Sequence, residues 1–153
     1  MIINSVVEIP KGCAQKYEYN TKGYFEYDRS LNTAMVYPAN YGFIPNTLAE
    51  DGDALDVILY NQNPIERGTV VESKVLGVLD MEDEGEKDYK ILAIPLNHIS
   101  LFSSLKDAPE TLLKIYKNFF AHYKDLEGKK VVAKKWLSKE SAYDIINNCA
   151  KKK

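Results

Sequence analysis

Residues 50–60 read EDGDALDVILY, an acidic turn that runs directly into an apolar segment. The last six residues, LDVILY, show little alternation, a pattern that predicts a strand buried on both faces. Ahead of it, Asp51, Asp53 and Asp56 stand close together around Gly52, whose freedom at positive φ permits a sharp turn. We therefore expect a loop that enters a buried strand and brings three carboxylates together at its mouth.

Short strand patterns also occur on both sides of this segment. Alternating or paired aliphatic residues, bounded by turn residues, are typical of strands. They predict further strands at residues 2–9, 15–19, 24–28, 69–79, 89–96 and 129–136. The turn TKG joins the second and third of these into a hairpin, and the acidic segment 80–88 joins the fourth and fifth.

Two helical patterns follow near the end of the chain. Residues 109–127, PETLLKIYKNFFAHYKDLE, carry apolar side chains at helical spacing. Asp107, three residues before Glu110, resembles the start of a capping box for this helix, and Ser138 is expected to cap a final helix. Short strands followed by two helices favour an α+β fold that is mainly β, a small closed barrel flanked by C-terminal helices.

The composition restricts the kind of protein. With 153 residues, 45% hydrophobic residues and a net charge of −2, the chain is expected to form a single globular domain over residues 1–153. So balanced a charge does not favour a nucleic-acid partner. The apolar runs are too short to cross a membrane, no signal-peptide pattern begins the chain, and the only cysteines are Cys13 and Cys149, so we expect a cytoplasmic protein.

The crowding of Asp51, Asp53 and Asp56 has two explanations. Two unit charges about 4 Å apart repel by about 4 kcal/mol at an effective dielectric of roughly 20, so converging carboxylates need a counter-charge. Mg²⁺ would supply it, because it accepts several oxygen ligands at once. Alternatively, the segment is a solvated turn, in which Asp and Gly are ordinary residues. An EF-hand fits less well, because position 12 of its loop would be Gln62 instead of Glu.

A second acidic segment and a set of basic and phenolic residues favour the metal explanation. The segment DMEDEGEKDYK at 80–90 has the composition of an exposed hairpin tip. Two acidic loops at strand ends could nevertheless meet across a barrel mouth and form a multi-metal site for phosphoryl groups. Phosphate oxygens also require fixed donors. Although each has an ordinary structural explanation, the candidate donors are Lys16, Arg29, Tyr37, Tyr41, Tyr123 and Lys124.

A series of motifs occurs in one order along nearly the whole chain and resembles the soluble family I inorganic pyrophosphatases. The motifs are EIPKG (8–12), KYE (16–18), DR (28–29), YPANYGFIPNT (37–47), DGDALD (51–56), MEDEGEKDYK (81–90) and HYKDLE (122–127). The resemblance implies a five-stranded closed barrel of OB type with flanking helices. It also implies an inorganic diphosphatase, which uses magnesium to hydrolyse pyrophosphate to two orthophosphates by in-line attack of a metal-bound water or hydroxide. The chain departs from the family at Gln15 and Ala54, commonly Asn and Pro, and neither supplies a chemical group.

The resemblance further implies a role for each acidic residue. The metal ligands that it implies are Glu18, Asp51, Asp56, Asp83 and Asp88. Asp56 would bridge two tightly bound ions, and Asp83 with Asp88 would hold an ion that arrives with the substrate. Asp53 would accept the proton of the nucleophilic water, and Glu8 would lie behind the metal ligands. The ions are expected to be magnesium, with manganese or zinc as substitutes.

The same resemblance divides the donors between the two halves of the substrate. Lys16, Tyr41 and Lys90 would surround the phosphoryl group under attack. The donors around the leaving phosphate, together with a tyrosine beside the site, would be Arg29, Tyr123, Lys124 and Tyr37. Hydrolysis of so highly charged a substrate requires positive groups on both halves, which agrees with this division.

Expectations about assembly and competing activities are less specific. Family members of this size commonly form homo-oligomers, and a hexamer is favoured. The helix that carries Phe119, Phe120 and His122 is either a core helix or a contact surface, and the isolated His98 and His122 are expected to be structural.

One alternative activity is magnesium-dependent hydrolysis of nucleotides or longer polyphosphates, although no base-binding surface is evident. Another is a nucleic-acid-binding barrel with stacking tyrosines, which would need a basic groove instead of an acidic mouth.

Overall fold

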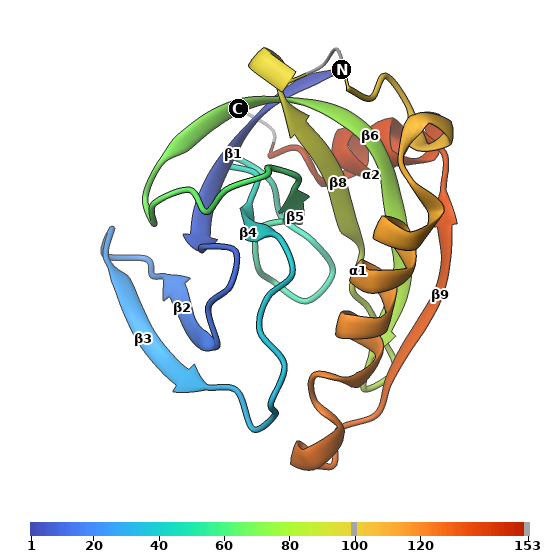
Figure 1. Ribbon diagram of the computed structural model, residues 1–153. Coiled ribbons are helices and arrows are strands. Elements are labelled where there is room, and N and C mark those ends of the chain that lie inside the picture. Colours follow the sequence, from blue (N-terminus) through green and yellow to red (C-terminus); the bar gives the residue numbers. More distant parts are fainter. Residues whose placement is uncertain (99–100, 152–153) are drawn as a thin grey trace.

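In the computed structural model, five strands of one sheet close into a ring (Figure 1). The structure describes residues 1–98 and 101–151. In order around the ring, the strands are β1 (Ile2–Ile9), β4 (Asn40–Phe43), β5 (Asp56–Leu59), β8 (Lys90–Pro95) and β6 (Val70–Asp83). β6 also pairs with β1, which closes the ring, and β5 runs parallel to β8. The expected five-stranded closed barrel is therefore confirmed.

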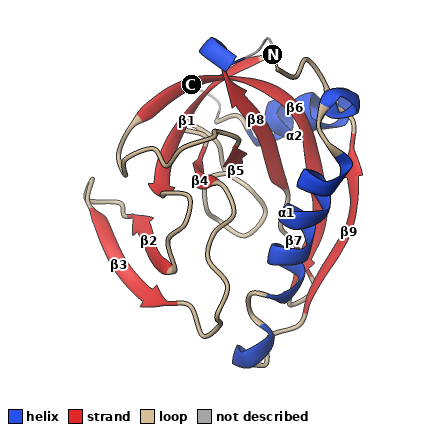
Figure 2. Cartoon of the chain, in the orientation of Figure 1, coloured by secondary structure: helices blue, strands red, loops and turns tan. Residues whose placement is uncertain are grey.

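Further strands and two helices surround the ring (Figure 2). β7 (Glu86–Lys87) and β9 (Val131–Leu137) pair with β6. A separate two-stranded sheet, the outer hairpin, consists of β2 (Gln15–Tyr19) and β3 (Phe25–Ser30). The helices are α1 (Glu110–His122) and α2 (Lys139–Cys149), and the short 3-10 helices are η1 (Leu96–His98), η2 (Leu105–Asp107) and η3 (Asp125–Glu127).

β5 lies in the centre of the core, as its apolar sequence predicts. Val57, Ile58 and Leu59 are each 1% exposed. Because successive side chains of a strand point to opposite faces, Ile58 joins the apolar cluster that contains the aromatic residues of α1. Val57 and Leu59 join a second cluster, which contains Ile146 of α2. Packing on both faces gives the acidic turn before β5 a rigid base.

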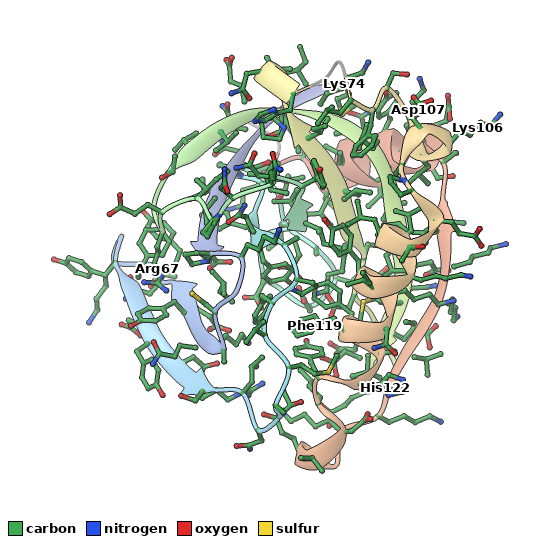
Figure 3. All side chains as sticks on the ribbon, viewed as in Figure 1. Arg67, Lys74, Lys106, Asp107, Phe119 and His122 are labelled. Carbon is green, nitrogen blue, oxygen red and sulfur yellow. The ribbon has the colours of Figure 1, made fainter. Side chains whose placement is uncertain are left out.

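α1 is a core helix on the face that carries its aromatic residues. Phe119 and Phe120 are each 2% exposed and pack on one another with their ring centroids 5.0 Å apart. His122, at the end of the helix, is exposed, and its Nδ1 lies 2.9 Å from Asp125 Oδ2 (Figure 3). Of the two roles that the sequence leaves open for Phe119 and Phe120, the structure supports the core role.

Some local expectations hold and others fail. Ser138 caps α2, because its Oγ accepts a hydrogen bond from Ser141 N at 3.3 Å. The capping box predicted for α1 is wrong: Pro109 occupies the N-cap position, and Asp107 Oδ2 instead accepts from Ser103 N at 2.8 Å. The acidic segment 80–88 is more ordered than a loop, because β6 continues through its first half and pairs with β7.

Gly42 on β4 lies against β1, where no larger residue fits. A Cβ at this position would stand 1.7 Å from Val6 O and 2.8 Å from Val6 C, and neither backbone atom can move without opening the pairing of β1 with β4. We expect Gly42→Ala to lower the free energy of unfolding by about 3 kcal/mol, as severe overpacking does. Urea denaturation of the two purified proteins measures the difference.

Gly85→Ala is the matched control for this prediction. Gly85 has a φ of +86°, but a Cβ there would meet no atom within 4 Å. Its replacement therefore adds backbone strain without a clash, at a cost of about 1 kcal/mol. Equal losses of stability in the two variants would contradict the steric explanation for Gly42.

Candidate active site

One pocket, with a volume of about 560 Å³, collects nearly all the residues singled out in the sequence. It is lined by side chains from β1, the outer hairpin, the turn before β5, the end of β6, β8 and the end of α1. Arg29 is the one predicted site residue that does not line it. The predicted residues that do are Glu8, Lys16, Glu18, Tyr37, Tyr41, Asp51, Asp53, Asp56, Asp83, Asp88, Lys90, Tyr123 and Lys124.

The turn that carries the aspartates is built as the sequence predicts. Gly52 adopts a φ of +89°, and Asp53 N donates to Asp51 Oδ1 at 3.0 Å, which fixes the two aspartates relative to one another. Asp56 is the first residue of β5 and is paired in register with Lys90 of the parallel strand β8. The turn therefore delivers three carboxylates to the pocket, and the strand register sets a cation beside the third.

Lys90 forms a buried cluster with Asp56, Asp88 and Tyr41. Its side chain is 3% exposed, and its Nζ lies 2.7 Å from Asp56 Oδ2 and 2.9 Å from Asp88 Oδ1. Nζ also donates to Tyr41 Oη at 2.7 Å. One ammonium group thus serves two carboxylates, so the cluster carries more negative than positive charge when all three groups are ionised.

This imbalance appears in the pKa values of the cluster. Burial raises the pKa of Asp56 to about 6, because the attraction of Lys90 offsets the loss of hydration only in part. Burial acts in the same direction on Asp88, but there the charge of Lys90 prevails and lowers the pKa. Burial would lower the pKa of Lys90, yet the surrounding negative groups hold it well above its ordinary value. Lys90 is therefore held in its charged form, and Asp56 is the less compensated of the two carboxylates in the cluster.

The other carboxylates of the pocket have local partners. Asp83 Oδ2 contacts Lys124 Nζ, whereas its Oδ1 is buried and has no hydrogen-bond partner among the residues that the structure describes. Lys16 Nζ lies 2.9 Å from Glu18 Oε1. Glu8 Oε2 accepts from Tyr19 N at 2.8 Å, and burial raises the pKa of Glu8 to about 7. Partial loss of hydration at the pocket, followed by the charge of Asp51, also raises the pKa of Asp53, although its side chain is exposed.

Arg67 is a residue of this region that the sequence does not single out. Its guanidinium lies 3.5 Å from the centre of the Tyr17 ring, and its Nε donates to Glu8 O at 2.7 Å, so it joins the outer hairpin to β1 (Figure 3). No motif marks it, because the contact depends on how the hairpin folds back on the barrel. Glu127, which pairs with Arg29, ends the motif HYKDLE, but the sequence assigns it no role of its own.

Within the two described ranges, no three His, Cys, Asp or Glu side chains stand in an arrangement that would hold a metal ion. The position of Lys90 provides a reason, because its Nζ lies between Asp56 and Asp88. Two observations nevertheless fit a divalent cation: the buried Oδ1 of Asp83, which has no partner in the part of the chain that the structure describes, and the raised pKa of the incompletely compensated Asp56.

Comparison with known proteins places the chain in a family. A family model described as inorganic pyrophosphatase matches residues 5–153. The inorganic pyrophosphatase of Halalkalibacterium halodurans is 44% identical over 151 residues, which cover 97% of this chain and 93% of the relative. The inorganic pyrophosphatase of Aeropyrum pernix is also 44% identical over 151 residues, which cover 95% of this chain and 86% of that relative.

Solved structures give the same result. An inorganic pyrophosphatase from Coxiella burnetii has a TM-score of 0.93 and 39% identity, with 97% of this chain and 92% of that one covered. The barrel is therefore of OB type, as the resemblance implied. In the part of the chain that the structure describes, no helix is long and apolar enough to cross a membrane. The match to the family model over nearly the whole sequence, supported by these relatives, shows that the chain belongs to the inorganic pyrophosphatases, a family of hydrolases.

Proposed function

We propose that the chain uses magnesium to hydrolyse inorganic pyrophosphate to two orthophosphates. Family membership supports pyrophosphate as the substrate and implies a metal cofactor. The observation that carries the proposal is the cluster of Asp56, Asp88 and Lys90 in the pocket that also contains Asp51 and Asp53. Buried carboxylates beside fixed cations are what a multiply charged phosphate and its counter-ions require.

The residues that would hold the metal are Glu18, Asp51, Asp56, Asp83 and Asp88. All would supply carboxylate oxygens, which suit magnesium better than a softer metal. When bound, magnesium supplies positive charge that offsets the phosphate oxygens and makes water more acidic. Manganese, which also suits carboxylate oxygens, would be a closer substitute than zinc, which favours nitrogen and sulfur ligands.

The side chains divide the remaining work. Asp53 would accept a proton from the attacking water, and its raised pKa makes it a stronger base than an ordinary aspartate. Tyr41 and Lys16 would offer donors to the phosphoryl group under attack, and Tyr41 is fixed by the hydrogen bond of 2.7 Å that its Oη accepts from Lys90. Lys90 Nζ already donates to Tyr41, Asp56 and Asp88, so it would exchange one of these acceptors for a phosphate oxygen. Burial keeps Tyr41 protonated, because it raises the pKa of the phenol.

The leaving phosphate would be bound by the opposite group of donors. Tyr123 and Lys124 line the pocket at the end of α1, and Arg29 would reach it from β3. Lys124 already contacts Asp83, so binding of a phosphate would exchange one anionic partner for another. Donors on both halves of the substrate stabilise the charge that moves to the leaving group as the bond breaks.

Activity measurements test this proposal directly. Release of phosphate should be rapid with pyrophosphate and magnesium, should stop with a chelator, and should return when excess magnesium is added. Rates with ATP and tripolyphosphate, measured at the same concentrations, should be far lower, because no base-binding surface is evident in the sequence. Equal rates with ATP would favour the alternative of a nucleotide phosphohydrolase.

Asp53→Asn is expected to lower kcat for pyrophosphate on the order of 10²-fold, because the amide cannot accept the proton of water. The unfolding midpoint should not change, since Asp53 is exposed. Glu50→Gln is the matched control: Glu50 is an exposed residue of the same segment and does not line the pocket. Near-normal turnover by Asp53→Asn would exclude it as the base.

We also propose a single domain over residues 1–153 and a cytoplasmic homo-oligomer, with a hexamer favoured. Leu126, which is 80% exposed on η3, is the kind of apolar side chain that a subunit contact would cover. Size-exclusion chromatography with light scattering measures the mass, and a monomer at micromolar concentration would contradict this assembly. The acidic pocket supports no nucleic-acid partner, in agreement with the charge balance.

A further inference from the structure

Arg29 and Glu127 form an ion pair that joins the outer hairpin to the end of α1. Arg29 Nε lies 3.1 Å from Glu127 Oε1, and Arg29 Nη2 donates to Glu127 Oε2 at 3.3 Å. Arg29 belongs to β3, whereas Glu127 ends η3, the short helix whose N-cap is Lys124. The pair therefore fixes the arginine next to the segment that carries Tyr123 and Lys124.

The Glu127 carboxylate is well placed to orient Arg29. The Glu127 side chain is 9% exposed, and that of Arg29 is 29% exposed, so water competes only weakly for the contact. Neither residue lines the pocket, whereas Lys124 does. Arg29 is paired in register with Lys16, which lines the pocket, so Glu127 holds the arginine beside the pocket without placing its own negative charge inside, where it would repel phosphate.

The geometry of the pair leaves part of the guanidinium available. A guanidinium carries five N–H donors in one plane, and Glu127 occupies only the edge formed by Nε and Nη2. The Nε contact is close enough for an ion pair but lacks hydrogen-bond alignment, since Nε is buried without a hydrogen-bond partner among the described residues. Nη1 and the second N–H of Nη2 form the edge that could bind a second anion.

We infer that Glu127 is a positioning residue, which holds Arg29 so that the free edge of its guanidinium meets the leaving phosphate. The inference rests on the proposed function, because it takes that phosphate to come from pyrophosphate. Without Glu127, the long arginine side chain would be ordered only when substrate binds, and ordering a flexible side chain weakens binding. Glu127 would thus act on the reaction solely through Arg29.

Glu127→Gln, Arg29→Met and the double variant test this inference. The glutamine keeps the size of the side chain and removes its charge. We expect Glu127→Gln to lower kcat/KM for pyrophosphate about 10- to 100-fold, and to weaken binding of inorganic phosphate in calorimetry, with the unfolding midpoint preserved. In the Arg29→Met background the same change should have no further effect. Glu127→Asp, which keeps the charge, should recover part of the loss.

Glu110→Gln is the matched control, because it breaks an ion pair on the exposed face of α1. Glu110 Oε1 lies 3.3 Å from Lys114 Nζ, and both side chains are largely exposed, so kcat/KM should not change. Losses that multiply in the double variant would overturn the inference, as would a loss of activity that follows a lowered unfolding midpoint. If the unaltered chain failed to hydrolyse pyrophosphate, the proposed function would be wrong. The phosphate affinities of the parent, Glu127→Gln, Arg29→Met and the double variant would still decide whether Glu127 acts through Arg29.

Discussion

Lys90→Met is expected to lower the free energy of unfolding by about 3–5 kcal/mol in metal-free buffer, because it leaves two partly buried carboxylates without a counter-charge. Lys90 Nζ lies within 3 Å of Asp56 and Asp88, at 2.7 and 2.9 Å, and the lysine side chain is 3% exposed. Methionine fills a similar volume, so the loss of charge is the main change. Urea unfolding in the presence of a chelator measures the effect, and kcat should fall because Lys90 is also a proposed donor.

Magnesium and a second substitution should each restore stability to Lys90→Met. An ion that binds the folded chain and not the unfolded chain stabilises it by mass action, so excess magnesium should raise the unfolding midpoint more in the variant than in the parent. Adding Asp56→Asn to Lys90→Met should also raise the unfolding midpoint, because the second substitution removes one of the two uncompensated charges.

Lys134→Met is the control for Lys90→Met. Lys134 Nζ lies 2.8 Å from Glu82 Oε1, but the lysine side chain is 41% exposed, so its loss should cost about 0–1 kcal/mol. The ion pairs of the two lysines have nearly the same length, but Lys90 is buried and Lys134 is exposed. If the two variants were equally stable without metal, buried charge would not explain the role of Lys90.

Asp56→Asn alone is expected to lower the rate of pyrophosphate hydrolysis about 10³-fold and to leave the fold intact. Asp56 is a proposed metal ligand, and an amide at this position would remove a negative charge from the metal site. The remaining pair of Asp88 and Lys90 is balanced in charge, with its atoms 2.9 Å apart, so stability should be preserved. Phosphate release at saturating magnesium gives the rate, and calorimetry should show weaker binding of magnesium.

Glu84→Gln provides the comparison for Asp56→Asn. Glu84 is an exposed residue of the second acidic segment and does not line the pocket. The activity of Glu84→Gln should therefore stay within about twofold of the parent, as is usual for surface substitutions. If Asp56→Asn hydrolysed pyrophosphate as fast as Glu84→Gln, Asp56 would not be a metal ligand.

Much of the fold could be predicted because its signals are local. β1, the outer hairpin and β5 are recognisable from aliphatic spacing and turn residues, and Ser138 marks the start of α2. β4 was not predicted, because its four residues, NYGF, lie in a segment rich in Pro and Gly and offer no alternation. They form a strand because β1 and β5 pair with them on either side, and Gly42 permits the close approach of β1.

The candidate site divides in the same way. Gly52 and the spacing of its neighbours predict a turn that gathers Asp51, Asp53 and Asp56, and the structure places all three at one pocket. The pairing of Arg29 with Glu127 could not be predicted, because it joins residues 98 positions apart. No local pattern records which of many charged residues will meet across such a distance.

Patterns along the chain predict most of the strands and helices, the acidic turn and, through the motifs, the family. Which charges share a partner depends on the folded arrangement of distant segments. The parallel register of β5 and β8 sets Asp56 opposite Lys90, and Lys90 in turn contacts Asp88 two residues before it. Spacing and turn chemistry act over a few residues and can be read directly, whereas the register of two strands and the burial of a charge depend on how the whole chain packs.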